Sequence, residues 1–177
     1  MPQAIAEALT ACGAASAVLP TGVPPAWAAT VAAAGIRLHT DEPTLSHQSL
    51  NGIDAVVTGA AVAMADSGTI ALDHSEDQGR RALSLLPDVH VCVVRADQVV
   101  SDVPEGIARL APALRARRPI NLAQRRVSDQ RHLLPVVDRA PATNADIDLR
   151  IRIEKWQLSQ LSHARWPPVD TRQLLCL

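Results

Sequence analysis

The sequence predicts an α/β domain with a mostly parallel sheet flanked by helices, and three observations favour this fold class. Short apolar runs recur along the first two-thirds of the chain, separated by segments with helix signals, which is the rhythm of strand–helix–strand units. Of the 177 residues, 47% are hydrophobic and 20% are charged, a balance that supports a buried core and excludes a disordered chain. The eight glycines all lie at or before Gly106, in the part of the chain where turns and helix ends require them.

The first elements alternate between helix and strand. Gly13 and Gly35 each follow an apolar segment with helical character, and the prolines at 24 and 25 suit the first turn of a helix. A short apolar run comes soon after each of these glycines. We therefore expect a helix over residues 4–12, a strand over 17–19, a helix that runs from the two prolines to residue 34, and a strand over 36–39.

The middle of the chain holds the clearest strands. The run that ends at Gly59 is apolar at its centre, and Pro104 suits the first position of a helix. We expect strands over residues 54–58, 70–73, 90–95 and 119–122, an acidic polar loop over 74–78, and a helix from residue 104 with one face made of Ile107, Leu110, Ala111 and Leu114.

Charge divides the chain into two unlike parts. Residues 1–114 carry five Arg and 12 acidic residues, a net charge of −7, whereas residues 115–177 carry 11 Arg, one Lys and six acidic residues, a net charge of +6. The strand–helix rhythm also stops after residue 122, and Pro135 interrupts the next apolar run. We expect one domain over residues 1–122 and a basic, poorly ordered tail over residues 123–177.

Several classes of function lose support. Cys12, Cys92 and Cys176 are too widely spaced for a disulfide framework or a cysteine pair that binds metal. No apolar run is long enough to span a membrane, and the N-terminus lacks the basic residues of a signal peptide, so we expect a cytoplasmic protein. The Arg-rich tail has no nucleic-acid-binding motif and few aromatic residues for base stacking, so we expect no nucleic-acid partner.

A polar turn between two predicted strands is the first candidate site. Successive backbone N–H groups and two hydroxyl groups in such a turn can bind an anion, and glycine permits a close approach of the ligand. The same residue types also form ordinary turns, and this alternative stays open. The candidate ligand-binding residues here are Gly59, Asp66, Ser67, Gly68 and Thr69.

Basic residues form the second candidate group. Gly79, Arg80 and Arg81 place two guanidinium groups after a flexible residue, and guanidinium binds carboxylate or phosphate in a bidentate manner. Arg95, at the end of a predicted strand, joins this group. The alternative is that Arg80 and Arg81 pair with acidic residues just upstream, namely Asp73, Glu76 and Asp77.

His90 and Cys92 lie two residues apart on a predicted strand and so face the same side. No other ligand at a recognisable spacing supports a metal site, and a packed strand explains the pair equally well. His90 could instead act as an acid, a base or a hydrogen-bond donor. The chain has none of the G-x-S-x-G, P-loop or G-x-G-x-x-G motifs, so we assign no catalytic residue.

Four segments in register carry a family resemblance over roughly residues 4–122. They are Asp54-Ala55-Val56-Val57-Thr58-Gly59, the run from Ala63 to Ile70, the run from Gly79 to His90, and the run from Val93 to Val100. Together they resemble the lactate-utilisation protein C group of the LUD-domain family.

The resemblance implies a fold like that of the sugar-phosphate isomerase and CoA-transferase superfamily. It also implies a role in the oxidation of L-lactate to pyruvate, alongside iron–sulfur partner proteins, with a small anionic ligand and no cofactor in this chain. Two alternatives remain: an independent small-molecule enzyme with the same fold, and a non-functional truncated product.

The chain departs from the family pattern at both ends. Family members usually begin with an additional helical segment, and after a strand like residues 119–122 they continue with a Ser-Gly-Pro-Ser-x-Thr-x-Asp-Ile-Glu motif that is absent here. Codons permitted for residues 123–132, when translated one base later, give Leu-Ser-Gly-Val-Ser-Ala-Thr-Ser-Asp. We therefore expect a frameshift near residue 122 and a sheet that is incomplete at its C-terminal end.

Overall fold

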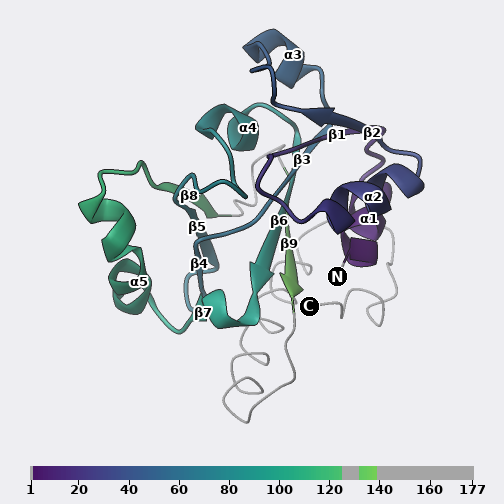
Figure 1. Cartoon of the computed structure of the whole chain (residues 1–177). Coiled ribbons are helices and arrows are strands. Elements are labelled where there is room, and N and C mark those ends of the chain that lie inside the picture. The colour runs from purple at the N-terminus through teal and green to yellow at the C-terminus, as the bar shows by residue number, and fades with distance from the viewer. Residues whose placement is uncertain (1, 125–131, 139–177) are drawn as a thin grey trace.

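The computed structural model describes residues 2–124 and 132–138. A five-stranded parallel sheet forms its centre, in the order β2-β1-β3-β6-β9 (Figure 1). The strands are β1 (Ser16–Leu19), β2 (Arg37–Thr40), β3 (Ala55–Thr58), β6 (Val89–Arg95) and β9 (His132–Asp138). The prediction of an α/β domain with a mostly parallel sheet is confirmed.

Helices cover both faces of the parallel sheet. Alternate side chains of a strand point to opposite faces, so Val57 and Val91 face α1 (Pro2–Ala11) and α2 (Pro25–Ala33). Val18 and Val56 point the other way, towards α3 (His47–Asn51) and α4 (Arg81–Leu85). Burial on both faces explains why these strands are continuous apolar runs rather than alternating ones.

A second, smaller sheet packs on the same face as α3 and α4. Its order is β7-β4-β5-β8, and it is built around the antiparallel hairpin of β4 (Val62–Met64) and β5 (Thr69–Leu72). A short 3-10 helix, η1 (Ala96–Gln98), leads from β6 into β7 (Val99–Val100), which runs parallel to β4, while β8 (Asn121–Gln124) runs antiparallel to β5. One face of this sheet packs against Cys92 and Val94 of β6, and α5 (Val103–Arg115) covers the other face.

The buried face of α5 differs from the predicted one. Leu110 is buried as expected, but Ile107 and Leu114 are 53% and 49% exposed. The buried positions are Gly106, Leu110 and Ala113. Gly106 decides this orientation, because Met64 of β4 occupies the space that a side chain at Gly106 would need. The helix therefore approaches the sheet through its least bulky residue.

Four further elements differ from the sequence-based expectation. The short strands β4 and β7 and the helix α3 were not predicted, since two to five residues carry too little periodicity to be recognised. β9 is a regular strand beside β6 although it contains Pro135, because a strand at the edge of the described sheet tolerates a residue without an N–H donor.

No helix within the described part of the chain is both long and apolar enough to cross a lipid bilayer.

Candidate functional site

A cavity of about 280 Å³ lies where β3 and β6 end, at the carboxyl edge of the parallel sheet. Ligands of open α/β sheets bind outside this edge, because the loops that follow the strands converge there. The segments that follow β3 and β5, the end of β6, η1 and the second half of α5 surround the cavity. Its lining residues are Ala60, Ala61, Asp73, Ser75, Asp77, Gln78, Arg95, Gln98, Arg109, Leu110, Pro112, Ala113 and Arg118.

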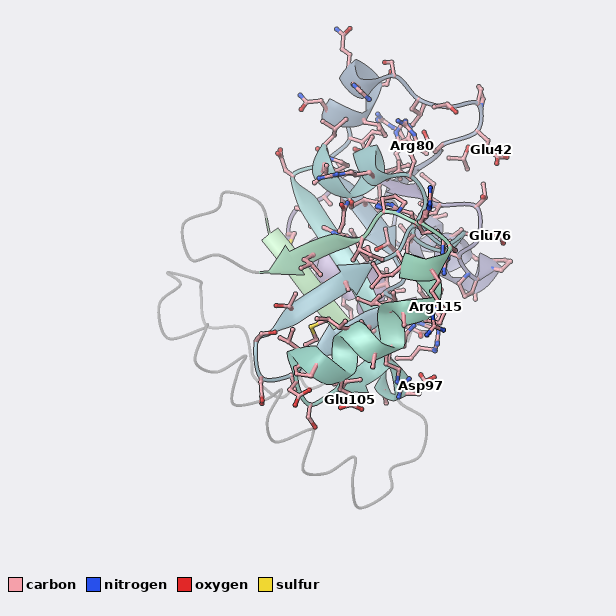
Figure 2. The ribbon with its side chains drawn as sticks, turned by 90° about the vertical axis from the view of Figure 1, so that its left-hand side faces the viewer. Glu42, Glu76, Arg80, Asp97, Glu105 and Arg115 are labelled. Atoms are coloured by element: carbon pink, nitrogen blue, oxygen red, sulfur yellow. The ribbon has the colours of Figure 1, made fainter. Side chains whose placement is uncertain are left out.

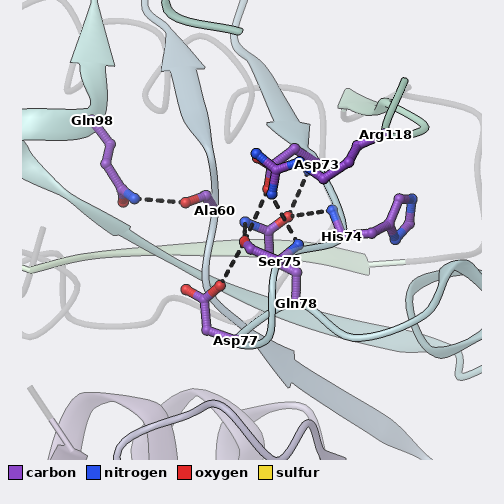
Figure 3. A network of polar contacts seen from close by, with 8 residues as sticks. All are labelled: Ala60, Asp73, His74, Ser75, Asp77, Gln78, Gln98 and Arg118. Atoms are coloured by element: carbon purple, nitrogen blue, oxygen red, sulfur yellow. Dashed lines mark hydrogen bonds and ion pairs between the residues drawn. The ribbon is translucent and has the colours of Figure 1, made fainter. Parts of the chain in front are cut away.

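One wall of the cavity is the loop over residues 73–79, which is organised by internal hydrogen bonds (Figure 3). Gln78, only 2% exposed, accepts the backbone N–H of Asp73 at 2.6 Å and donates to Ser75 Oγ at 2.8 Å. Ser75 Oγ is 2.9 Å from a carboxylate oxygen of Asp73 and 2.9 Å from one of Asp77. The network fixes both carboxylates relative to the cavity.

Two glycines let this loop lie directly on the ends of β1 and β3. Gly59 donates its N–H to the carbonyl of Asp77 at 2.9 Å, and Gly22 donates to the carbonyl of Glu76 at 3.2 Å. At both positions an added Cβ would collide with the loop, with the Asp77 side chain and with the Glu76 backbone respectively. Gly59 is therefore required for close packing beside the cavity.

The other wall carries guanidinium groups. Arg95 Nε lies 3.1 Å from Asp97 Oδ1, and Arg109 Nη1 donates to the carbonyl of Asp97 at 3.1 Å. Gln98 holds this wall in place, because it donates to the carbonyl of Ala60 at 2.6 Å and accepts the N–H of Arg95 at 2.9 Å. A guanidinium has five N–H donors, so these contacts leave donors that can bind an anion in the cavity.

A third guanidinium, that of Arg118, pairs with the loop. Its Nη2 lies 2.9 Å from Asp73 Oδ2, and the Asp73 side chain is 12% exposed. Among the described residues, three cations and two carboxylates, Asp73 and Asp77, thus line the cavity.

The predicted turn over residues 66–69 lies elsewhere. It joins β4 to β5 at the end of the hairpin farthest from the cavity, since Ala61 and Asp73 flank the opposite end. Gly68 has a positive φ of 61°, and Ser67 Oγ donates to Thr69 Oγ1 at 2.9 Å. Asp66 donates its N–H to the carbonyl of Ser101 at 3.0 Å. These bonds describe a hairpin turn, and its role as an anion site stays a prediction.

Arg80 pairs with Asp41, not with the acidic residues upstream of it. Its Nε and Nη2 contact the two carboxylate oxygens of Asp41 at 2.6 and 2.9 Å, and Nη2 also donates to the carbonyl of Leu45. The alternative that Arg80 pairs with Asp73, Glu76 or Asp77 is therefore wrong. This hydrogen-bonded pair lowers the pKa of the Asp41 carboxyl.

The predicted basic residues do not converge on one site. Figure 2 shows Arg80 near Glu42 at one end of the molecule and Asp97, the partner of Arg95, at the other. Arg81 is exposed in the first position of α4. Gly79 has a positive φ of 66° and packs against Leu83 and Pro20, where it ends the 73–79 loop.

His90 lies inside the sheet rather than in the cavity. Its Nε2 is 2.8 Å from Thr58 Oγ1 on the neighbouring strand, and desolvation lowers the pKa of His90 to about 4. Burial likewise raises the pKa of the Cys92 thiol to about 12. A neutral imidazole and a protonated thiol are packing groups at neutral pH. Among the described residues no group of three or more His, Cys, Asp or Glu side chains is placed to hold a metal ion.

Of the predicted ligand-binding residues, Arg95 lines the cavity and Gly59 packs beside it, but most of the lining was not predicted. Asp73 and Asp77 were considered only as partners for arginine, and Arg109 and Arg118 were not singled out. The position of Asp73 directly after a strand could have indicated a site residue. The sequence around Arg109 and Arg118 gave no such indication, because only the packing of α5 brings these two residues to the edge of the sheet.

Comparison with known proteins decides the family. The model of the LUD domain matches residues 35–155 of this chain. The chain belongs to the LUD domain family. A relative in this family, the lactate utilization protein C of Deinococcus radiodurans, is 49% identical over 120 residues, which are 68% of this chain and 54% of that protein. This chain thus spans about half the length of that relative.

A solved LUD-type structure agrees with the fold. The crystal structure of a DUF162 family protein from Deinococcus radiodurans at 1.70 Å resolution has a TM-score of 0.68 and 44% sequence identity, and the similarity covers 77% of this chain and 82% of that one. The family prediction is confirmed. The LUD match continues past residue 122, so the division of the chain there stays a prediction.

Proposed function

We propose that this LUD-domain chain acts in lactate utilisation, in the oxidation of L-lactate to pyruvate together with iron–sulfur partner proteins in the cytoplasm. The observation that carries the proposal is its 49% identity over 120 residues to a protein named lactate utilization protein C. Membership of the LUD domain family supports it.

The cavity is the site through which the chain takes part. Arg95 and Arg109 present guanidinium groups at the carboxyl edge of the parallel sheet, where charge-assisted hydrogen bonds to a carboxylate are strong. A small organic anion is therefore the ligand proposed for this site. The exposed fraction of Arg95, 54%, leaves its head group accessible from solvent.

Growth on L-lactate tests the proposal. A strain that lacks the gene should grow poorly on L-lactate as the only carbon source and recover when the chain is supplied. A variant with both Arg95→Ala and Arg109→Ala should fail to restore growth, because the cavity loses two of its three cations. Arg115→Ala is the matched control, since Arg115 belongs to the same helix but does not line the cavity.

Two results would contradict the proposal. Normal growth of the deletion strain on L-lactate would contradict the proposed role in lactate utilisation. Full recovery of growth with the double arginine variant would show that the cavity is not needed for this role, provided that the variant accumulates to the level of the unaltered chain.

A further inference from the structure

The two walls of the cavity offer different chemistry to a ligand. Arg95 and Arg109 present donors on the side of η1, where both contact Asp97. The 73–79 loop presents acceptors, the carboxylates of Asp73 and Asp77. Figure 3 shows Ala60 between Gln98, on the basic side, and the group formed by the 73–79 loop. A ligand in the cavity would therefore meet cations at one end and carboxylates at the other.

We infer that the carboxylate wall makes the cavity selective for hydroxy monocarboxylates over the corresponding keto acids, with Asp77 as the specificity-determining residue. The inference rests on the proposed binding of an organic anion in this cavity. The ligand carboxylate binds Arg95 and Arg109, and a ligand hydroxyl donates a hydrogen bond to Asp77.

The selectivity follows from what a carboxylate can do. An ionised carboxylate only accepts hydrogen bonds and has about four acceptor positions. Asp73 already accepts from the N–H of Ser75 and pairs with Arg118. The single O–H of Ser75 lies 2.9 Å from both carboxylates and can donate to only one of them at a time, which leaves Asp77 the freer acceptor of the two. A hydroxyl can donate to Asp77, whereas a keto oxygen brings its own lone pairs against a negative charge.

The volume of the cavity and the charge of its walls extend the proposed ligand class beyond lactate. A volume of about 280 Å³ is near the lower end of the range for small-molecule sites, roughly 300–1,000 Å³, and exceeds what a three-carbon acid fills. The hydroxyl of Ser75, which lines the cavity, can accept a hydrogen bond from an additional ligand hydroxyl group. Arg118 already pairs with Asp73, so a second ligand carboxylate at this wall would be repelled mainly by Asp77. Longer hydroxy acids with one carboxylate therefore belong to the class.

Calorimetric titration of the full chain with matched acids tests the inference. L-lactate, propionate and pyruvate differ only at the second carbon, which carries a hydroxyl, hydrogens or a keto oxygen. We expect L-lactate to bind about tenfold or more tightly than pyruvate, with propionate between them, because the hydrogen bond is made to a charged acceptor. Gluconate, a longer hydroxy monocarboxylate, should bind at least as tightly as L-lactate, and malate more weakly.

Asp77→Asn supplies the decisive variant. The amide keeps the shape of the side chain but can donate to a keto oxygen, so the preference for L-lactate over pyruvate should fall to about twofold or less. Asp88→Asn, at an exposed loop position outside the cavity, should keep the full preference. The thermal unfolding midpoint of each variant confirms that it is folded.

Equal or tighter binding of pyruvate by the unaltered chain overturns the inference, whatever the variants do. If that chain still restores growth on L-lactate, the pathway role stands and only the selectivity is wrong. If none of the acids binds, the cavity is not the ligand site and both statements about it fail.

Discussion

At the scale of single residues, His90 is the clearest case of a side chain whose environment sets its chemistry. The imidazole is 8% exposed and lies 2.8 Å from Thr58 Oγ1, between strands that have little water around them. The neutral form is favoured because a buried charge would lose its hydration. Burial thus keeps His90 uncharged at neutral pH, where it is a packing group of the core. The imidazole takes up a proton only in acid, near its pKa of about 4.

The stability of the fold should depend on pH through His90. Its pKa is about 4 in the folded chain and about 6.5 when unfolded, so the unfolded state binds more protons between these values. Stability is unaffected by this group above pH 6.5 and falls as the pH decreases towards 4, by about 3 kcal/mol in total. Chemical denaturation of the chain at pH 7 and pH 5 measures the loss.

His90→Val separates this effect from the titration of other groups. The variant has no imidazole to protonate, so its free energy of unfolding should fall less between pH 7 and pH 5 than that of the unaltered chain. An identical decrease in both proteins would show that His90 does not titrate in this range.

At the scale of elements, α5 depends on Gly106 for its position on the small sheet. Met64 of β4 fills the space beside this residue, and the helix buries Leu110 and Ala113 on the same face. Glycine is unfavourable inside a helix by roughly 0.5–1 kcal/mol relative to alanine. Its presence here therefore reflects packing rather than helix propensity.

Gly106→Ala should destabilise the chain despite the higher helix propensity of alanine. The new methyl group would overlap the side chain of Met64, which is buried and would have to repack, and overpacking of this kind typically costs about 1–3 kcal/mol. Thermal and chemical denaturation measure the change. Ala108→Gly on the exposed side of the same helix gives the propensity effect alone. A more stable Gly106→Ala protein would contradict the packing argument.

The same element shows what sequence reasoning could and could not supply. The central strands β3 and β6 were predicted because continuous apolar runs flanked by turn residues identify buried parallel strands. The buried face of α5 was not fully predicted, because Ile107 and Leu114 are large apolar residues, whereas the helix packs against Met64 through Gly106. The cavity was missed for a related reason: Asp77 and Arg109 are distant in sequence, and tertiary packing alone brings them together.

At the scale of the whole molecule, the C-terminal third differs from the rest of the chain in its charge, and we attribute this difference to a change of reading frame. The LUD match covers residues 35–155, while the net charge changes from −7 over residues 1–114 to +6 over residues 115–177. We predicted a frameshift near residue 122, and the cavity residues Asp73 to Arg118 all precede it. The candidate site is therefore encoded upstream of the predicted shift.

The nucleotide sequence across residues 118–135 tests this prediction. Translation one base later should give a Ser-Gly-x-Ser-x-Thr-x-Asp stretch and continue in an open frame with regular glycine usage. Codons that give no such motif in the neighbouring frame would show that the basic tail is the true continuation of the chain.

The 73–79 loop is anchored by its main chain, through the carbonyls of Glu76 and Asp77 on Gly22 and Gly59, while the side chains of Asp73, Ser75 and Asp77 turn to the cavity. Backbone anchoring is indifferent to side-chain identity, whereas the Ser75 hydroxyl joins three side chains of the loop and is part of its structure. Residue 77 has fewer such contacts, so a substitution there would change which acid is accepted and leave the loop in place. Related proteins that share the two glycines and Ser75 but differ at residue 77 would be expected to recognise different acids.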